Sequence, residues 1–161
     1  MKLKINDNIP DVEVFQLINN EPEIIKIKKI FKDKKTILLG MPGAFTSVCS
    51  SKHLPGYLSN LDRFKSKGID LIACIAVNDP FVMKAWCDAN KAGNDILFLA
   101  DGNASLSKAL GLTFDGSMYS LGVRSQRFAM ILTGLKVEKL FVEKPGVFDV
   151  SSAQKVLGHL S

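Results

Sequence analysis

The sequence contains little cysteine and histidine. There are three cysteines, Cys49, Cys74 and Cys87, and two histidines, His53 and His159. The cysteines show no CxxC spacing and no His-rich pattern, so the usual zinc-binding arrangements are excluded. An odd number of cysteines also argues against a framework of disulfide bonds. We therefore expect free thiols in a reducing compartment, with at least one of them at work.

Long hydrophobic runs are absent as well. No apolar stretch approaches the roughly 20 residues that a membrane-spanning helix needs. The first seven residues lack the apolar core of a secretory signal. We therefore expect a cytoplasmic protein that does not associate with a membrane.

The charge is moderately basic, with a formal net charge of +5. The lysines are dispersed apart from one cluster between residues 26 and 35. Nucleic-acid binding would require a basic face interleaved with exposed aromatic residues, and this pattern is missing. We expect no nucleic-acid partner, but a solvated basic surface that attracts small anions or an acidic redox partner.

The pattern of apolar residues predicts a single domain over residues 1–161. Paired strands come first, then strands alternate with helices, and a hairpin and a helix close the chain. This order favours an α/β, thioredoxin-like fold, in which a mixed central sheet has helices on both faces and an N-terminal β-hairpin extension. Strands are predicted over 12–17, 24–27, 35–41, 69–77, 96–100, 127–132 and 137–142, and helices over 46–67, 80–87, 103–110 and 151–160.

Cys49 lies where the buried strand 35–41 runs into the helix 46–67. Thr46 is a good N-cap residue, which places Cys49 in the first turn of that helix. Unpaired N–H groups and the positive end of the helix dipole favour a thiolate there, and the thiolate is the nucleophilic form. Pro55 lies inside the helix and is expected to kink it.

Three further residue types suit a reaction at this thiol. Thr46 offers a hydroxyl to the sulfur or to a substrate, and Pro42 shapes the loop and removes one N–H donor. A fixed positive charge is expected from Arg124 or Arg127. Arg127 opens an apolar strand, so a rigid element aims it inward, and arginine presents a fork of donors that stays protonated.

The residues Pro42, Thr46 and Cys49 form a pattern similar to the PxxxTxxC signature of the peroxiredoxins. The longer run 42–57 resembles the type II, or peroxiredoxin-five, branch of that family, as do segments 77–86 and 124–128. The resemblance extends from about residue 5 to residue 160. It implies a thiol peroxidase that reduces hydrogen peroxide and alkyl hydroperoxides in antioxidant defence and cell redox homeostasis, without a metal, haem, flavin or other cofactor.

The resemblance also implies roles for individual residues. Cys49 would be the peroxidatic cysteine, which attacks the O–O bond and becomes a sulfenic acid. Pro42, Thr46 and Arg127 would form its pocket, and backbone N–H groups around Gly43 and Cys49 would hold the peroxide. The branch often forms homodimers through a face near this site.

Phe45 and His53 lie within the matched run. Phe45 would line the pocket or a dimer face, with core packing as the alternative. His53 is either a general base or a partly exposed polar residue beside the site.

The sulfenic acid must be reduced before it oxidises further. Segment 143–150 contains no cysteine, so a resolving cysteine near the C-terminus is not available. Cys74 matches a second cysteine of plant-like members, 25 residues after the first, but it also reads as a small buried hydrophobic residue. Cys87 fits no known pattern. We expect a one-cysteine cycle with glutaredoxin and glutathione, or thioredoxin, as the reductant.

Other functions remain open at this point. Oxidation of Cys49 could alter a partner interaction without sustained turnover, as in a redox sensor or binding protein. A disulfide oxidoreductase is disfavoured by the lack of a CxxC pair. Cys-His hydrolysis is disfavoured because neither histidine comes with an obvious orienting partner.

Overall fold

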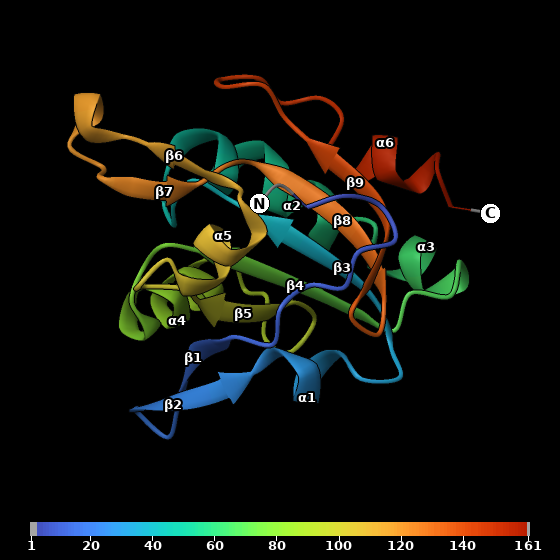
Figure 1. Cartoon of the computed structure of the whole chain (residues 1–161), viewed down its shortest axis with the longest axis horizontal. Coiled ribbons are helices and arrows are strands. Elements are labelled where there is room, and N and C mark those ends of the chain that lie inside the picture. The colour runs from blue at the N-terminus through green and yellow to red at the C-terminus, as the bar shows by residue number, and fades with distance from the viewer. Residues whose placement is uncertain (1–2, 161) are drawn as a thin grey trace.

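A seven-stranded mixed sheet forms the centre of the molecule, in a computed structural model that describes residues 3–160. The strand order is β2-β1-β5-β4-β3-β8-β9, as Figure 1 shows. The strands are β1 (Glu13–Ile18), β2 (Glu21–Lys26), β3 (Lys35–Gly40), β4 (Leu71–Ala76), β5 (Leu97–Ala100), β8 (Phe128–Thr133) and β9 (Lys136–Val142).

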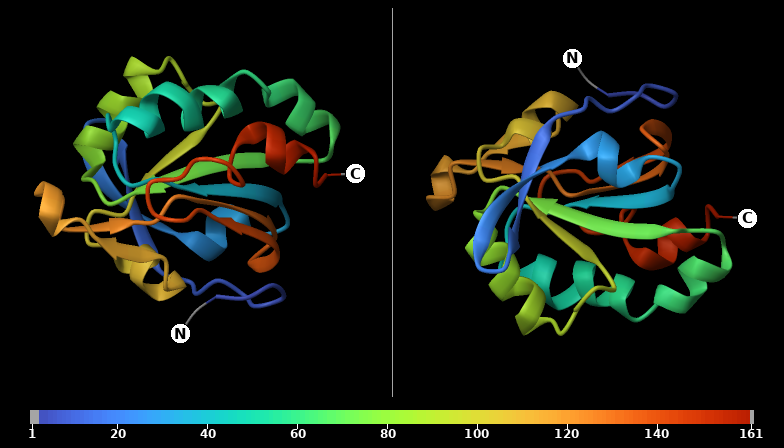
Figure 2. Two further views of the ribbon diagram at one scale, coloured as in Figure 1. Left: turned by 90° about the horizontal axis from the view of Figure 1, so that it is seen from above. Right: turned by 90° about the horizontal axis from the view of Figure 1, so that it is seen from below.

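Strands β3, β4 and β5 run parallel, and β8 pairs with β3 in the antiparallel sense. Strand β4 is wholly apolar, and β3 is apolar from Ile37 onward, because both of their faces are covered. Helices on both faces supply this cover (Figure 2). One face carries α2 (Leu54–Leu58), α3 (Leu61–Ser66), α4 (Pro80–Ala89) and α6 (Ala153–Leu157), and the other carries α1 (Ile27–Phe31) and α5 (Ser105–Leu110).

The predicted fold class is confirmed, including the N-terminal hairpin of β1 and β2. Four short elements, a helix, two strands and a 3-10 turn, were not predicted. Helix α1 lies inside the lysine cluster and has only five residues, of which Ile27 and Phe31 are buried. A separate two-stranded sheet pairs β6 (Thr113–Asp115) with β7 (Val123–Ser125), joined across the 3-10 turn η2 (Ser117–Tyr119). These elements are too short for a periodic pattern to indicate them.

The single helix predicted over 46–67 is wrong. A π-helical turn, η1 (Cys49–His53), precedes α2, and a break separates α2 from α3. The π-turn lies directly before Pro55, which lacks the N–H that a regular α-helix would use. The break follows because Ser59 and Asn60 turn their side chains back onto the carbonyls of the preceding turn.

Candidate active site

The loop between β3 and the helical turn that begins at Ser47 carries the predicted site. Gly40 ends β3 opposite Phe128, and a Cβ atom on Gly40 would lie 1.9 Å from the Phe128 ring. The glycine therefore lets β8 approach β3 at the point where the chain leaves the sheet. Residues 41–46 form the loop, and Ser47 and Val48 begin the helical turn. Cys49 follows them and is fully buried.

Arg127 contacts the sulfur of Cys49. Its Nη2 donates a hydrogen bond to Cys49 Sγ at 3.1 Å. The pairing of Gly40 with Phe128 accounts for this contact, since it places the residue before β8 beside the end of β3. The guanidinium thus places a positive charge and a fork of donors beside the sulfur.

His53 lies on the far side of the same guanidinium. Arg127 Nη1 lies 2.9 Å from His53 Nδ1, and His53 Nε2 lies 3.2 Å from the carbonyl oxygen of Ser151. The carbonyl only accepts, so Nε2 carries the proton and Nδ1 accepts from Arg127. Burial, and then the charge of Arg127, lowers the pKa of His53 from 6.5 to about 3, although the Ser151 bond opposes this.

The structure corrects two interpretations of His53. The side chain is fully buried, not partly exposed, and it has two orienting partners. Both ring nitrogens are engaged, so His53 holds Arg127 instead of acting as a general base. It remains neutral because burial and the adjacent guanidinium both oppose a second proton.

The depressed pKa of His53 predicts a specific loss of stability in mild acid. The unfolded chain takes up a proton near pH 6.5, whereas the folded chain does not until about pH 3. The contribution of His53 to the free energy of unfolding is therefore fully present above its unfolded pKa of 6.5. It decreases as the pH drops, by about 2 kcal/mol between pH 7 and pH 5. Urea unfolding at both pH values, for wild type and His53→Gln, measures it.

In His53→Gln this part of the pH dependence should disappear. His159→Gln is the matched control: it removes the other histidine, whose ring packs on Phe141, and should keep the wild-type loss of stability between pH 7 and pH 5. An identical pH dependence in wild type and His53→Gln would contradict the assignment of a buried, neutral imidazole.

Thr46 occupies the N-cap position, but its hydroxyl does not cap the helix. The carbonyl of Thr46 accepts from the N–H of Ser50 at 3.0 Å. The hydroxyl instead donates to the carbonyl of Gly43 at 2.7 Å, which tightens the loop. Its lone pairs remain available to accept a hydrogen bond from a bound molecule.

Arg124 and Asn78 fix the remainder of the loop. Arg124 Nη1 donates to the carbonyl of Pro42 at 3.2 Å, and Asn78 Oδ1 accepts from the N–H of Ala44 at 2.9 Å. A Cβ on Gly43 would lie 2.5 Å from the same Arg124 nitrogen, so a larger residue there would displace the Arg124 side chain. Of the two arginines considered, Arg127 thus contacts the sulfur and Arg124 supports the loop.

Two backbone N–H groups of the loop are available to a ligand. Within the part of the chain that the structure describes, neither the N–H of Gly43 nor that of Cys49 donates to a protein acceptor. Phe45 is 55% exposed and has a φ of 63°, so it does not pack in the core. Core packing, one of the two readings of Phe45, is therefore excluded.

Cys74 lies on β4, between Leu39 and Phe98 of the neighbouring strands, in the same core cluster as Cys49. It is fully buried. Burial, and to a lesser extent the charges of Cys87 and Cys49, raises the pKa of Cys74 well above its ordinary value. A neutral, enclosed thiol of this kind is a poor nucleophile.

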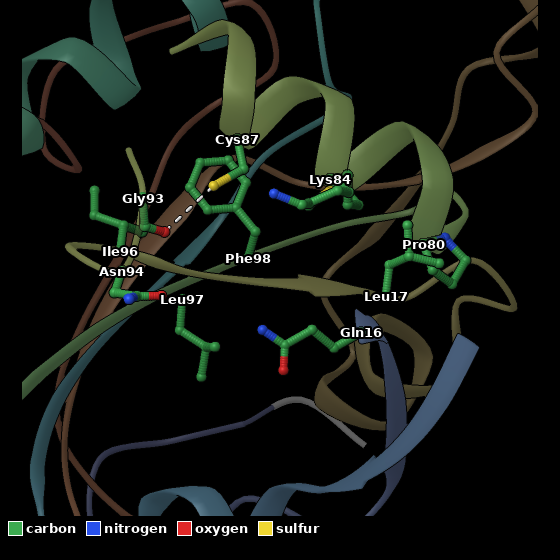
Figure 3. Close-up of a pocket in the computed structure, with 11 residues that line it drawn as sticks. Gln16, Leu17, Pro80, Lys84, Cys87, Gly93, Asn94, Ile96, Leu97 and Phe98 are labelled. Atoms are coloured by element: carbon green, nitrogen blue, oxygen red, sulfur yellow. Dashed lines mark hydrogen bonds between the residues drawn. The ribbon is translucent and has the colours of Figure 1, made fainter. Parts of the chain in front are cut away.

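Cys87 lies on the buried side of α4, with Met83 and Trp86, beside a hollow of about 360 Å³ (Figure 3). Its thiol donates a long hydrogen bond of 3.5 Å to the carbonyl of Gly93, and burial raises its pKa. The hollow contains none of the predicted site residues. Its lining is formed by Gln16, Leu17, Pro80, Met83, Lys84, Cys87, Gly93, Asn94, Ile96, Leu97 and Phe98.

Sequence reasoning missed the residues behind the pocket. No site role was predicted for Asn78, although its place after β4 puts it beside the end of the parallel neighbour β3. Ser151 and Glu143 carried no local signal, because they reach the site through contacts with distant segments.

Neither a metal centre nor a membrane span is indicated by residues 3–160. No group of three or more histidine, cysteine, aspartate and glutamate side chains among them is arranged to hold a metal ion. None of their helices has the length and apolar character needed to cross a bilayer.

Comparison with known proteins places this geometry in a family. Residues 4–157 match the Redoxin family. The chain is 43% identical over 156 residues to peroxiredoxin-2D of Arabidopsis thaliana, covering 96% of each protein. Among solved structures, it is similar to reduced Prx3 of Vibrio vulnificus in complex with H₂O₂, with a TM-score of 0.94, 44% identity and 99% of each chain covered.

A more distant structure is peroxiredoxin 5 of Alvinella pompejana, with a TM-score of 0.84, 35% identity and 96% of each chain covered. The agreement of sequence and fold over almost the whole chain confirms the resemblance noted from the PxxxTxxC pattern. The chain belongs to the redoxin family and, within it, to the type II or peroxiredoxin-five-like branch of the peroxiredoxins, the thiol peroxidases of antioxidant defence.

Proposed function

We propose that Cys49 is the peroxidatic residue and that Arg127 activates it. The thiolate attacks one peroxide oxygen, the O–O bond breaks, and the other oxygen leaves with the bonding pair and takes up a proton. The products are a sulfenic acid on Cys49 and water or an alcohol. The 3.1 Å contact between Arg127 and the sulfur is the observation that carries this proposal.

The peroxide is held by the loop that precedes Cys49. The N–H groups of Gly43 and Cys49 are the donors, and the Thr46 hydroxyl accepts from the peroxide O–H. Pro42 contributes no N–H of its own and leaves its carbonyl to Arg124. Donors fixed before the reaction stabilise the charge that develops on the departing oxygen. A relative solved with H₂O₂ supports hydrogen peroxide as one substrate. Alkyl hydroperoxides are the second substrate class in this proposal.

Peroxide consumption in the presence of dithiothreitol tests the proposal. Rapid loss that depends on Cys49 supports it. Rapid loss that persists when Cys49 is replaced would overturn the assignment of the site.

Recycling follows a one-cysteine cycle in this proposal. An external thiol attacks the sulfenic acid, water leaves, and a second thiol reduces the mixed disulfide. Glutaredoxin with glutathione, or thioredoxin, supplies these thiols. Support comes from Cys74, which is enclosed in β4 with a raised pKa.

Replacement of Cys74 by serine should therefore preserve most of the turnover with glutaredoxin and glutathione. Steady-state peroxide consumption measures this, with Cys87→Ser as the matched control for loss of a second thiol. Near-complete loss of turnover in Cys74→Ser alone, in a variant that still folds, would instead make Cys74 a resolving residue.

The chain acts in this proposal as a single catalytic domain that pairs into a homodimer beside the active site. Several large apolar side chains on and near the active-site loop and the β6–β7 sheet are exposed, which favours a covered face there. They are Phe45, Phe81, Met118, Tyr119 and Val123. Sedimentation of wild type and Met118→Glu tests the pairing, and a monomeric wild type would refute it. Three free thiols favour a reducing compartment such as the cytoplasm.

A further inference from the structure

A buried carboxylate, Glu143, lies behind the pocket and takes no part in the chemistry above. It follows β9 and is 6% exposed. Its Oε2 accepts three hydrogen bonds, from the N–H of Asp149 at 2.6 Å, the N–H of Ser151 at 3.0 Å and the hydroxyl of Ser151 at 2.7 Å. Charge-assisted bonds of this kind are strong, and they fix the loop that leads to α6.

Ser151 connects this loop to the site. Its carbonyl accepts from His53 Nε2 at 3.2 Å, and also from the hydroxyl of Tyr57 at 2.7 Å. Both donors are fully buried, so a displaced carbonyl would leave two polar groups without a partner. The position of His53 therefore depends on Ser151, and the position of Ser151 depends on Glu143.

The network reaches Arg127 at two points. The side-chain route runs through Ser151 to His53, whose Nδ1 accepts from Arg127 Nη1 at 2.9 Å. The main-chain route is direct, because the N–H of Glu143 donates to the carbonyl of Arg127 at 3.0 Å. Glu143 thus holds both the backbone and, indirectly, the guanidinium of Arg127.

The same loop also covers the guanidinium. Phe148 packs its ring 5.3 Å from the ring of His53, and the Cζ atom of Arg127 lies 5.9 Å from the centre of the Phe148 ring. This distance permits a cation–π interaction. If the loop between Glu143 and α6 shifted, Arg127 would lose its contact with Phe148, and His53 would lose the Ser151 carbonyl.

We propose that Glu143 is a positioning residue for the peroxidase reaction, which fixes Ser151 and, through His53, aims Arg127 at the sulfur of Cys49. The inference rests on the proposed roles of Cys49 and Arg127. It predicts that the loss of Glu143 slows the reaction with peroxide although Glu143 touches neither the sulfur nor the substrate.

The test compares wild type with Glu143→Ala and Glu143→Gln. Two quantities are measured: the rate of a single turnover with hydrogen peroxide, and the pH midpoint of alkylation of the Cys49 peptide, followed by mass spectrometry. Glu143→Ala should react about 10-fold more slowly or worse, with a higher midpoint, because misplacement of a catalytic group by about 1 Å costs up to about 100-fold. The amide oxygen of Glu143→Gln can replace Oε2 and should restore most of the rate.

Asp101 offers a matched control. It is 2% exposed and accepts the same set of bonds, from the N–H of Leu106 at 2.9 Å, the N–H of Ser107 at 2.8 Å and the Ser107 hydroxyl at 2.7 Å. These bonds hold α5 on the other face of the sheet. Asp101→Ala should lose stability without a change in the Cys49 midpoint or in the peroxide rate.

Three outcomes would overturn the inference: an unchanged rate and midpoint in Glu143→Ala, an equal slowing in Asp101→Ala, or no recovery in Glu143→Gln. If Glu143→Ala does not fold, Ser151→Ala removes only the hydroxyl donor, and an unchanged midpoint there overturns it equally. Cys49→Ser distinguishes a failure of the proposed active site from a failure of the positioning role of Glu143. An active Cys49→Ser refutes the proposed site, whereas an inactive one beside unaffected Glu143 variants refutes this inference alone.

Discussion

Replacement of Cys49 by serine should reduce peroxide consumption to the rate of the buffer with dithiothreitol alone. The serine hydroxyl has nearly the same shape but does not ionise near neutral pH, so no nucleophile remains beside Arg127. Loss of the nucleophile removes the whole enzymatic acceleration, because no other described cysteine combines a helix start with a contacting guanidinium. Peroxide remaining after a fixed time, followed by a colorimetric assay, measures the effect.

Cys87→Ser is the appropriate control, since it removes a thiol from α4 and leaves the loop before Cys49 intact. It should consume peroxide as the wild type does. Equal rates in wild type and Cys49→Ser would mean that the fold is present without the proposed chemistry, and a redox sensor or binding protein would then be the better reading.

Replacement of Arg127 by alanine should slow the reaction with peroxide by about 100-fold to 1000-fold, the range seen when one preorganised charge-stabilising donor is lost. The variant loses the donor at 3.1 Å from the sulfur and leaves Nδ1 of His53 unpaired. The thiolate fraction at neutral pH falls, and the charge on the departing oxygen loses its neighbour. Stopped-flow measurement of the second-order rate constant at several pH values separates these two contributions.

The unpaired imidazole in Arg127→Ala also costs about 1–3 kcal/mol of stability, so the rate must be measured on protein shown to be folded. Arg63→Ala is the matched control, because Arg63 is an exposed arginine of α3 whose side chain bonds Asn60. A rate constant for Arg127→Ala equal to that of wild type would rule out the proposed activation.

The sheet could be predicted because its information is local. Strand β4 is a continuous apolar run, β3 is apolar from Ile37 onward, and the breaks around Asn19-Asn20 and Gly134 indicate the two hairpins. The neighbourhood of Cys49 and Arg127 could be anticipated for a related reason: a cysteine at a helix start and an arginine at a strand start are both visible in short windows. The roles given to Pro42, Thr46 and Gly43 remain predictions.

The rest of the site depends on contacts that no short window contains. The bond between Arg127 and His53 joins residues 74 positions apart, and the bond between His53 and Ser151 joins residues 98 positions apart. The sequence therefore suggested only a general base or a partly exposed polar residue for His53, and it indicated no role for Glu143. The π-turn was missed because helical periodicity from Leu54 onward does not reveal an extra residue before Pro55.

The π-turn at Cys49–His53 also bears on how fast the enzyme can be recycled. Peroxide is small enough to reach an enclosed sulfur, but the thiol of a protein reductant is not, since Cys49 is fully buried. In the proposed one-cysteine cycle, reduction by such a protein would therefore wait for this segment to open. This segment is a π-turn instead of a regular α-helix, and the chain breaks again after α2, so we expect it to be the segment that opens. At high reductant concentration, the turnover rate would then be limited by how often this segment opens in the oxidised enzyme. A more reactive reductant would not increase that maximum rate.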